Sequence, residues 1–220
     1  MKTSLTLLAV AATAALAGPV KFGADALAGY NILAIGDHLD NAGTESKASF
    51  GFAIGPTVAY AINDQFSLGG KLSVLYDINR MSNPGVSGKS SDAIQPLGLG
   101  LQFAPSFQIN KQVEVKLGYE WDIPLAGSAD LGSTSPDIVW APDKGSDLGS
   151  NEAGLVSTQN VVLGGSYAVI PNLAVTLQGK IALTGIYPKY KTNGDLDGAA
   201  SSKDNIDVHQ IAVGVHYSFN

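Results

Sequence analysis

Very few side chains of this sequence could carry out covalent chemistry. It has three histidines and no cysteine, which excludes disulfides, thiolate metal sites and cysteine nucleophiles. His38 has no obvious serine partner, and His209 lies beside Asp207 on the same parity of its segment. His216 and Ser218 form a His-x-Ser pair, residue types that nucleophilic catalysis uses, but both lie on the polar parity of an alternating segment. We therefore expect His216 to be an ordinary hydrogen-bonding residue and the protein not to be an enzyme.

The sequence also predicts no cofactor and no metal. Glycine-rich phosphate loops and zinc-ligand spacings are absent. The run from Asn193 to Gly198 has a faint calcium-loop spacing of Asp and Gly, but it lacks the distal bidentate Glu that such loops need. We expect a solvated turn there.

Ionisable residues recur on the polar parity of the alternating segments. They are Lys21, Asp25, Lys71, Asp77, Glu114, Lys116, Glu120, Asp122, Lys180 and His216. Four lysines meet five carboxylates, and isolated charges inside a narrow interior would be costly, so they should pair. We expect a salt-bridge network that fills the interior, centred on Lys71, Lys116 and Lys180 with Glu114 and Glu120. Many glycines share the same parity, which leaves a water-filled conducting path open as the alternative.

The elements that must position these groups are eight stretches that alternate apolar and polar residues with a period of two, which indicates strands. They cover approximately residues 19–35, 49–62, 66–78, 97–109, 113–123, 161–169, 173–187 and 211–219. Three connections are tight turns, at 63–65, 110–112 and 170–172. The other four are long and polar, at about 36–47, 79–95, 126–156 and 188–205. An up-and-down sequence of strands with alternating short and long connections follows.

The apolar parity of these strands is expected to face lipid. In the second stretch the small, polar parity is too thin to clothe a water-facing exterior, and in other stretches that parity carries charge. Charged residues make up only 15% of the chain, against about 25% in a soluble domain. No segment after the N-terminal region is a long apolar run, so a membrane span must be made of strands. The predicted fold is all-β: a transmembrane, antiparallel, up-and-down eight-stranded β-barrel with a narrow polar interior.

The N-terminus is typical of an export signal. Met1-Lys2 gives a basic start, an apolar run follows, and Ala15-Leu16-Ala17 is a small-x-small cleavage site. We expect cleavage after Ala17, which divides the chain into a signal peptide, 1–17, and one barrel domain, 18–220. The net charge of −6 argues against nucleic acid as a partner.

Together these features resemble the small eight-stranded outer-membrane barrels, the OmpA/OmpX-like family of Gram-negative bacteria. The ending resembles the strand signal that the barrel-assembly machinery reads, with alternate apolar residues Val213, Val215, Tyr217 and Phe219. It departs by one residue, because Asn220 follows the final aromatic. The resemblance implies residence in the outer membrane, with outer-membrane lipid and lipopolysaccharide around the barrel. It does not imply one biological role, since this fold hosts several.

Aromatic residues fall near both ends of the strands, where two interfacial belts are expected. Near the turns they are Tyr60, Phe66, Phe107, Tyr167, Tyr217 and Phe219, and near the loops Tyr30, Tyr76, Trp121 and Tyr187. Pro56 and Pro105 lie in mid-strand, where we expect a bulge or a local kink at each.

The leading hypothesis is a non-enzymatic outer-membrane barrel that serves envelope integrity or surface interaction through its long loops. In the longest loop Trp140 lies among prolines and acidic residues, and it could anchor an extracellular partner or simply belong to a solvated acidic loop. A small-solute channel is the alternative. A lipid-modifying enzyme is a distant alternative. It is suggested by the His216-x-Ser218 pair, which is similar to that of outer-membrane lipid A deacylases, where the pair faces lipid. Here it is expected to point inward.

Overall fold

The computed structural model describes residues 20–35, 45–82, 92–130, 137–140, 152–185, 189–192, 195–197 and 206–219. The expected export signal, Tyr187 and Asn220 lie outside these ranges. Of the candidate calcium run, Asn193, Gly194 and Gly198 also lie outside them. Among the described residues, no helix has the length and apolar character needed to cross a bilayer.

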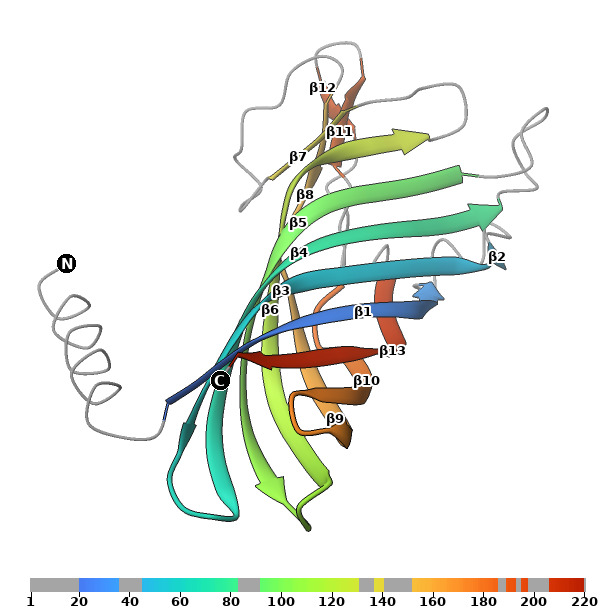
Figure 1. Cartoon of the computed structure of the whole chain (residues 1–220). Helices are drawn as coiled ribbons and strands as arrows, with labels where there is room; N and C mark the ends of the chain where they lie inside the picture. The colour runs from blue at the N-terminus through green and yellow to red at the C-terminus, as the bar shows by residue number, and fades with distance from the viewer. Residues whose placement is uncertain are drawn as a thin grey trace, which may run out of the picture.

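Eight long strands build a closed antiparallel barrel, which confirms the predicted fold class (Figure 1). They are β1 (Val20–Ile35), β3 (Ser49–Ala61), β4 (Phe66–Ser82), β5 (Asp92–Gln108), β6 (Val113–Asp130), β9 (Thr158–Ile170), β10 (Leu173–Ala182) and β13 (Ile206–Phe219). Each pairs with its neighbour in the chain, and β1 pairs with β13 from Phe22–Phe219 to Ile35–Ile206. Because the first strand meets the last, none of the eight is left as an open edge in the membrane.

Five short strands extend the sheet away from the tight turns. β2 (Glu45–Ser46) pairs with β4, and β7 (Asp137–Trp140) pairs with the far end of β6. β8 (Glu152–Leu155) runs parallel to β7 and contacts the hairpin of β11 (Lys189–Thr192) and β12 (Asp195–Asp197). In Figure 1 β7, β8, β11 and β12 lie together, β2 lies apart from them beside the end of β4, and the hairpin turns β3–β4, β5–β6 and β9–β10 lie at the opposite end of the barrel. We call the two ends the loop end and the turn end.

Burial alternates residue by residue along the barrel strands. On β1, for example, Asp25, Leu27 and Asn31 are buried, whereas Phe22, Tyr30 and Ile32 are exposed. The outer surface is therefore a continuous band of exposed aliphatic and aromatic side chains, and the polar groups face the interior. This is the reverse of a water-soluble barrel, and it is stable only where hydrocarbon covers the outside.

The aromatic residues mark the height of that band. On β4, Phe66 near the turn and Tyr76 further along are both exposed. Ten residues of strand span about 33 Å, or about 25 Å along the membrane normal at a tilt of about 40°. That height matches the apolar band of outer-membrane barrels. The ring of Phe66 packs against Phe107 with centroids 4.9 Å apart, and Tyr217 packs against Phe219 at 5.5 Å.

Three strands continue well past this band, which corrects the predicted boundaries. Residues 79–82 and 92–95 were expected in a loop, yet they belong to β4 and β5. β6 runs to Asp130 instead of ending near Ile123, and β10 ends at Ala182 instead of near Tyr187. Past the band the polarity of the two faces is reversed, because Met81 and Ile94 are buried inside whereas polar side chains face outward, so the alternation that identified the membrane-spanning part does not continue there. Arg80, for instance, is exposed on the extended part of β4.

The two mid-strand prolines interrupt the sheet without a bulge. The β3–β4 ladder skips Gly55 and Pro56, and the β5–β6 ladder skips Ala104 and Pro105, but the register is the same on either side of each gap. Of the expected bulge or local kink, the bulge is wrong, because the missing N–H removes a hydrogen bond on one side only and the register is kept. Gly118 lies opposite Ala104, and a Cβ atom on it would lie 2.5 Å from the Ala104 Cβ and from the Phe103 carbonyl oxygen. The strands therefore approach too closely there for any other residue.

A bulge occurs elsewhere, on β6. Leu97 pairs with Ala126 and Gly98 pairs with Pro124, so Leu125 has no partner across the β5–β6 ladder. Gly127, two residues on, has φ of 142°, a conformation that residues with a side chain rarely adopt. Beyond this point the inward and outward positions of β6 exchange, and Ala129 turns into the interior.

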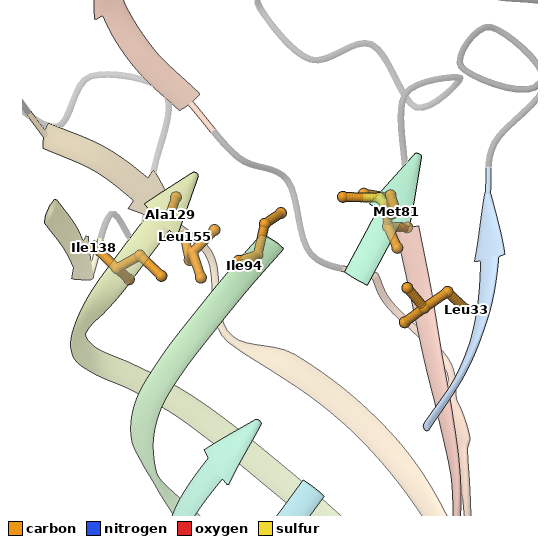
Figure 2. Packing of buried hydrophobic residues seen from close by; sticks show 7 residues of the cluster. Leu33, Met81, Ile94, Ala129, Ile138 and Leu155 are labelled. Atoms are coloured by element: carbon orange, nitrogen blue, oxygen red, sulfur yellow. The ribbon is translucent and has the colours of Figure 1, made fainter. Parts of the chain in front are cut away.

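Buried apolar residues gather inside the barrel at its loop end (Figure 2). We call this group the apolar plug; its members are Leu33, Met81, Ile94, Ala129, Ile138, Leu155 and Ile206. The first four and Ile206 come from the ends of five barrel strands, whereas Ile138 and Leu155 come from β7 and β8. The plug therefore fastens the short strands of the longest loop to the interior of the barrel.

Candidate functional site: the filled barrel interior

The interior of the barrel has three zones along its length. A cavity opens at the turn end, a polar layer fills the middle, and the apolar plug occupies the loop end. Each predicted interior group can be placed in one of the first two zones.

The cavity at the turn end, which we call the vestibule, has a volume of about 290 Å³. Residues of all three turns line its mouth, among them Asp64, Lys111 and Pro171, so it is open on that side. Its walls carry Lys21, Asp25, Lys71, Glu114, Lys116 and His216 from the predicted set. A volume this large holds many waters, since a single water needs only about 10–15 Å³.

The polar layer is built around Lys180. Its ammonium nitrogen lies 2.8 Å from Glu120 Oε1 and 2.7 Å from Asp122 Oδ2. Asn160 Nδ2 donates a further hydrogen bond of 3.0 Å to Asp122 Oδ2. The side chain of Glu120 is 1% exposed and that of Lys180 is 9% exposed, so this ion pair is largely removed from water, whereas Asp122 at 17% is less buried. Short, charge-assisted hydrogen bonds are what make such burial tolerable.

A second group of hydrogen bonds completes the polar layer across β1, β4 and β13. Asn31 Nδ2 donates to Asp77 Oδ1 at 2.9 Å and to Asn79 Oδ1 at 3.0 Å. Gln210 Nε2 in turn donates to Asn31 Oδ1 at 2.7 Å. Together with the Lys180 group, these amides form a polar layer across the middle of the barrel. A cavity of about 50 Å³ remains beside it, lined by Asp122, Lys180 and Leu155 among others.

A linear chain of hydrogen bonds lies on the vestibule wall where β1 meets β13. Asp25 Oδ1 and His216 Nδ1 are 2.6 Å apart, and His216 Nε2 and Ser218 Oγ are 3.1 Å apart. The order carboxylate, imidazole, hydroxyl is that of a nucleophilic triad. The backbone N–H of Ser218, however, donates to the Asn172 carbonyl at 2.9 Å and is not free to stabilise an oxyanion.

The predicted centre of the charge network is only partly right. Lys180 and Glu120 do form an ion pair, but the third member is Asp122, and Glu114 and Lys116 lie lower, in the vestibule. Lys71 is buried at the top of the vestibule, 4.0 Å from Asp25 Oδ2. Lys21 is exposed at the vestibule mouth, so it does not contribute to a buried network.

From the sequence we did not single out neutral polar residues as site residues, although their amides make many of the hydrogen bonds of the polar layer. They are Asn31, Asn79, Asn160 and Gln210. The sequence did contain a signal for them, because each lies on the polar, inward-facing parity of its strand. The apolar plug was not anticipated either, since Leu33 and Met81 share a parity with polar residues and interrupt the alternation.

Trp140 lies on β7 at the loop end and is exposed, with its indole N–H donating to Ser157 Oγ at 3.1 Å. The alternate residues Val213, Val215, Tyr217 and Phe219 of β13 all face outward and are exposed. Within the described residues, no group of three or more His, Cys, Asp or Glu side chains could hold a metal ion.

Comparison with known proteins agrees with this architecture. The family model described as outer membrane protein beta-barrel domain matches residues 3–219. Among solved structures, Neisserial surface protein A (NspA) is 19% identical, with 90% of this chain and 97% of that chain covered and a TM-score of 0.50. Ail, the attachment invasion locus protein of Yersinia pestis, is 13% identical, with 90% and 99% covered and a TM-score of 0.44. No curated protein matches the chain.

The family match spans nearly the whole sequence, and the closed, lipid-facing barrel is the structure that such a family requires. This chain therefore belongs to the outer membrane protein beta-barrel domain family and resides in the bacterial outer membrane.

Proposed function

We propose that this protein is a non-enzymatic, non-conducting barrel that acts at the cell surface through its loop end, or by reinforcing the envelope. The observation that carries the proposal is the closure of the interior by two successive zones. The Lys180–Glu120–Asp122 triad and its neighbouring amides cross the middle, the apolar plug occupies the loop end, and the cavity between them has a volume of only about 50 Å³. An eight-stranded barrel is just wide enough for side chains to fill it.

The loop end supports a role in surface contact. β4, β5 and β6 extend past the aromatic band and carry β7 and β8 with the exposed Trp140. The tight turns of outer-membrane barrels face the periplasm and the long loops face outward. These extended strands would therefore project from the membrane and present a rigid platform to an extracellular partner.

The proposal is tested by planar-bilayer recording of the purified barrel. We expect no stable, uniform current steps, whereas a general porin inserted in the same bilayers conducts. Liposomes carrying the protein should swell no faster in sugars or amino acids than protein-free liposomes. Uniform single-channel steps, or faster swelling, would contradict the proposal and favour the small-solute channel.

The Asp25–His216–Ser218 chain makes hydrolysis the second candidate function. A fluorophosphonate probe tests it directly, because it labels an activated serine and leaves an ordinary hydroxyl unmodified. We expect no label on Ser218, since its N–H is already bonded to Asn172 and the pair faces the vestibule instead of lipid. Labelling that disappears in His216→Ala would establish the enzyme.

The outward-facing final strand carries a further proposal, that the barrel-assembly machinery recognises Val213, Val215, Tyr217 and Phe219.

A further inference from the structure

The vestibule carries an excess of cationic side chains. Its lining includes Lys21, Lys71, Lys111 and Lys116, against the carboxylates of Asp25, Asp64 and Glu114. Above it, the polar layer has the opposite balance, with Asp77, Glu120 and Asp122 around Lys180. The interior is thus polarised, and the part open to solvent at the turn end is the positive part.

Lys71 is the buried cation that this arrangement leaves with a long ion pair and no hydrogen bond. Its side chain is 4% exposed, yet its ammonium nitrogen has no hydrogen bond within the described residues. The nearest carboxylate oxygen, Asp25 Oδ2, is 4.0 Å away, well beyond the 2.7–2.9 Å of a charge-assisted hydrogen bond. The other oxygen of Asp25 is already bonded to His216.

Lys180 shows how the same barrel satisfies a buried ammonium when nothing else is to bind it. It has two carboxylate oxygens within 2.8 Å, at a comparable degree of burial. A buried cation without a partner is costly, so the three donors of Lys71 call for an acceptor that occupies the vestibule. Gln102 and Thr176 line the same cavity and can add amide and hydroxyl donors.

We propose that the vestibule binds a small oxyanion, of the size and chemistry of inorganic phosphate, from the turn side, with the ammonium of Lys71 as its anchor. The cavity, at about 290 Å³, has room for the anion together with waters. Lipid headgroups are separated from it by the barrel wall, so the ligand is a free solute of the compartment that the turns face. This inference does not depend on the proposed surface function, because the vestibule lies at the turn end and none of its lining residues belongs to the short strands of the loop end.

The first experiment titrates inorganic phosphate into the refolded barrel in detergent micelles at constant ionic strength, with calorimetry as the readout. We expect saturable binding of one anion with a Kd of about 1 mM, and affinity about tenfold lower in Lys71→Gln. The matched control is Lys47→Gln, because Lys47 is an exposed lysine paired only with Glu45 outside the vestibule. Equal weakening by the two substitutions, or no saturable binding to the wild type, would overturn the proposal.

The second experiment needs no variant and stays valid if Lys71→Gln fails to fold. The wild-type barrel, with its lysine side chains labelled with carbon-13, is titrated with phosphate in micelles and followed by NMR, which reports on a buried ammonium without modifying it. We expect the Lys71 signal to shift saturably and the Lys47 signal to stay unchanged. Equal shifts of both signals, or none at either, contradict the site.

Discussion

Asp25 and His216 lie directly opposite each other where the first strand of the barrel meets the last, with Asp25 Oδ1 2.6 Å from His216 Nδ1. Residues 191 positions apart in the chain are thus joined at the rung that completes the ring. Asp25 is buried, and the ammonium groups of Lys116 and Lys71 also act on its carboxylate, that of Lys71 from 4.0 Å. The pair therefore fastens the seam between β1 and β13.

Breaking this pair should weaken the barrel measurably. We expect Asp25→Ala and His216→Ala each to lower the free energy of unfolding by about 1.5–3 kcal/mol, the value of a hydrogen bond to a charged group. The double variant should cost less than the sum of the two, because both substitutions remove one interaction. Urea unfolding in micelles, followed by the fluorescence of the two tryptophans, gives these values.

Ser218→Ala is the control for the seam, since it removes the other hydrogen bond of His216 and leaves the bond to Asp25 in place. Its effect should stay below about 1 kcal/mol, the range of an ordinary neutral hydrogen bond. Strict additivity of Asp25→Ala and His216→Ala would show that the two side chains are not coupled.

A second prediction concerns the buried triad. Lys180→Met leaves two carboxylates facing each other without a cation, and we expect it to cost about 3–5 kcal/mol of unfolding free energy. The triple variant Lys180→Met, Glu120→Gln and Asp122→Asn removes all three charges and should recover most of that loss. Lys47→Met breaks the exposed pair with Glu45 and should cost no more than about 1 kcal/mol. A triple variant as unstable as Lys180→Met alone would mean that packing, not unpaired charge, is responsible.

The sequence predicted which face of each strand the charged groups occupy, but not their depth. Alternation with a period of two fixes whether a residue points inward, and Lys180, Glu120 and Asp122 all do. Which of them meet depends on how far neighbouring strands are staggered around the barrel, and no single strand contains that information. Glu114 and Lys116 also point inward, but they line the vestibule, too near the turn end of the barrel to join the triad.

The extended strands could not be recognised for a different reason. The bulge at Leu125 exchanges the faces of β6, so the residues beyond it no longer fit the alternation that precedes it. The glycine, serine, proline and aspartate content of this region also suggested a loop. The apolar plug was hidden in the same way, because Ile138 and Leu155 acquire their inward role only when β7 and β8 pair beside the end of β6.

A third prediction tests the close approach of β5 and β6 beside Pro105. In Gly118→Ala the new methyl group would lie 2.5 Å from the Phe103 carbonyl oxygen, which is backbone and cannot rotate away. We expect a loss of about 1–3 kcal/mol, the usual cost of forcing an extra methyl group into a filled site. Gly179→Ala is the matched control on β10, where the nearest atom would be 3.8 Å away. There the substitution should be neutral or stabilise by up to about 1 kcal/mol, because alanine restricts the unfolded chain.

The same urea titration measures both glycine variants. If the two substitutions change the free energy of unfolding by the same amount and in the same direction, the proximity at Gly118 has no energetic consequence.

The last prediction separates a recognition signal from a lipid contact. Phe22 and Phe219 face each other on the same rung and are 58% and 56% exposed, so each loses a similar lipid contact when it is replaced by serine. Only Phe219 belongs to the final strand. If the assembly machinery reads that strand, Phe219→Ser should reduce the amount of folded barrel in cells several-fold, and Phe22→Ser should not.

Refolding of the two purified variants into micelles, where no machinery is present, should proceed to the same extent. The difference between boiled and unboiled samples on a gel quantifies folded barrel in both settings. Equal losses in cells would mean that Phe219 contributes to the membrane band alone, and the proposed signal would have to lie elsewhere in the chain.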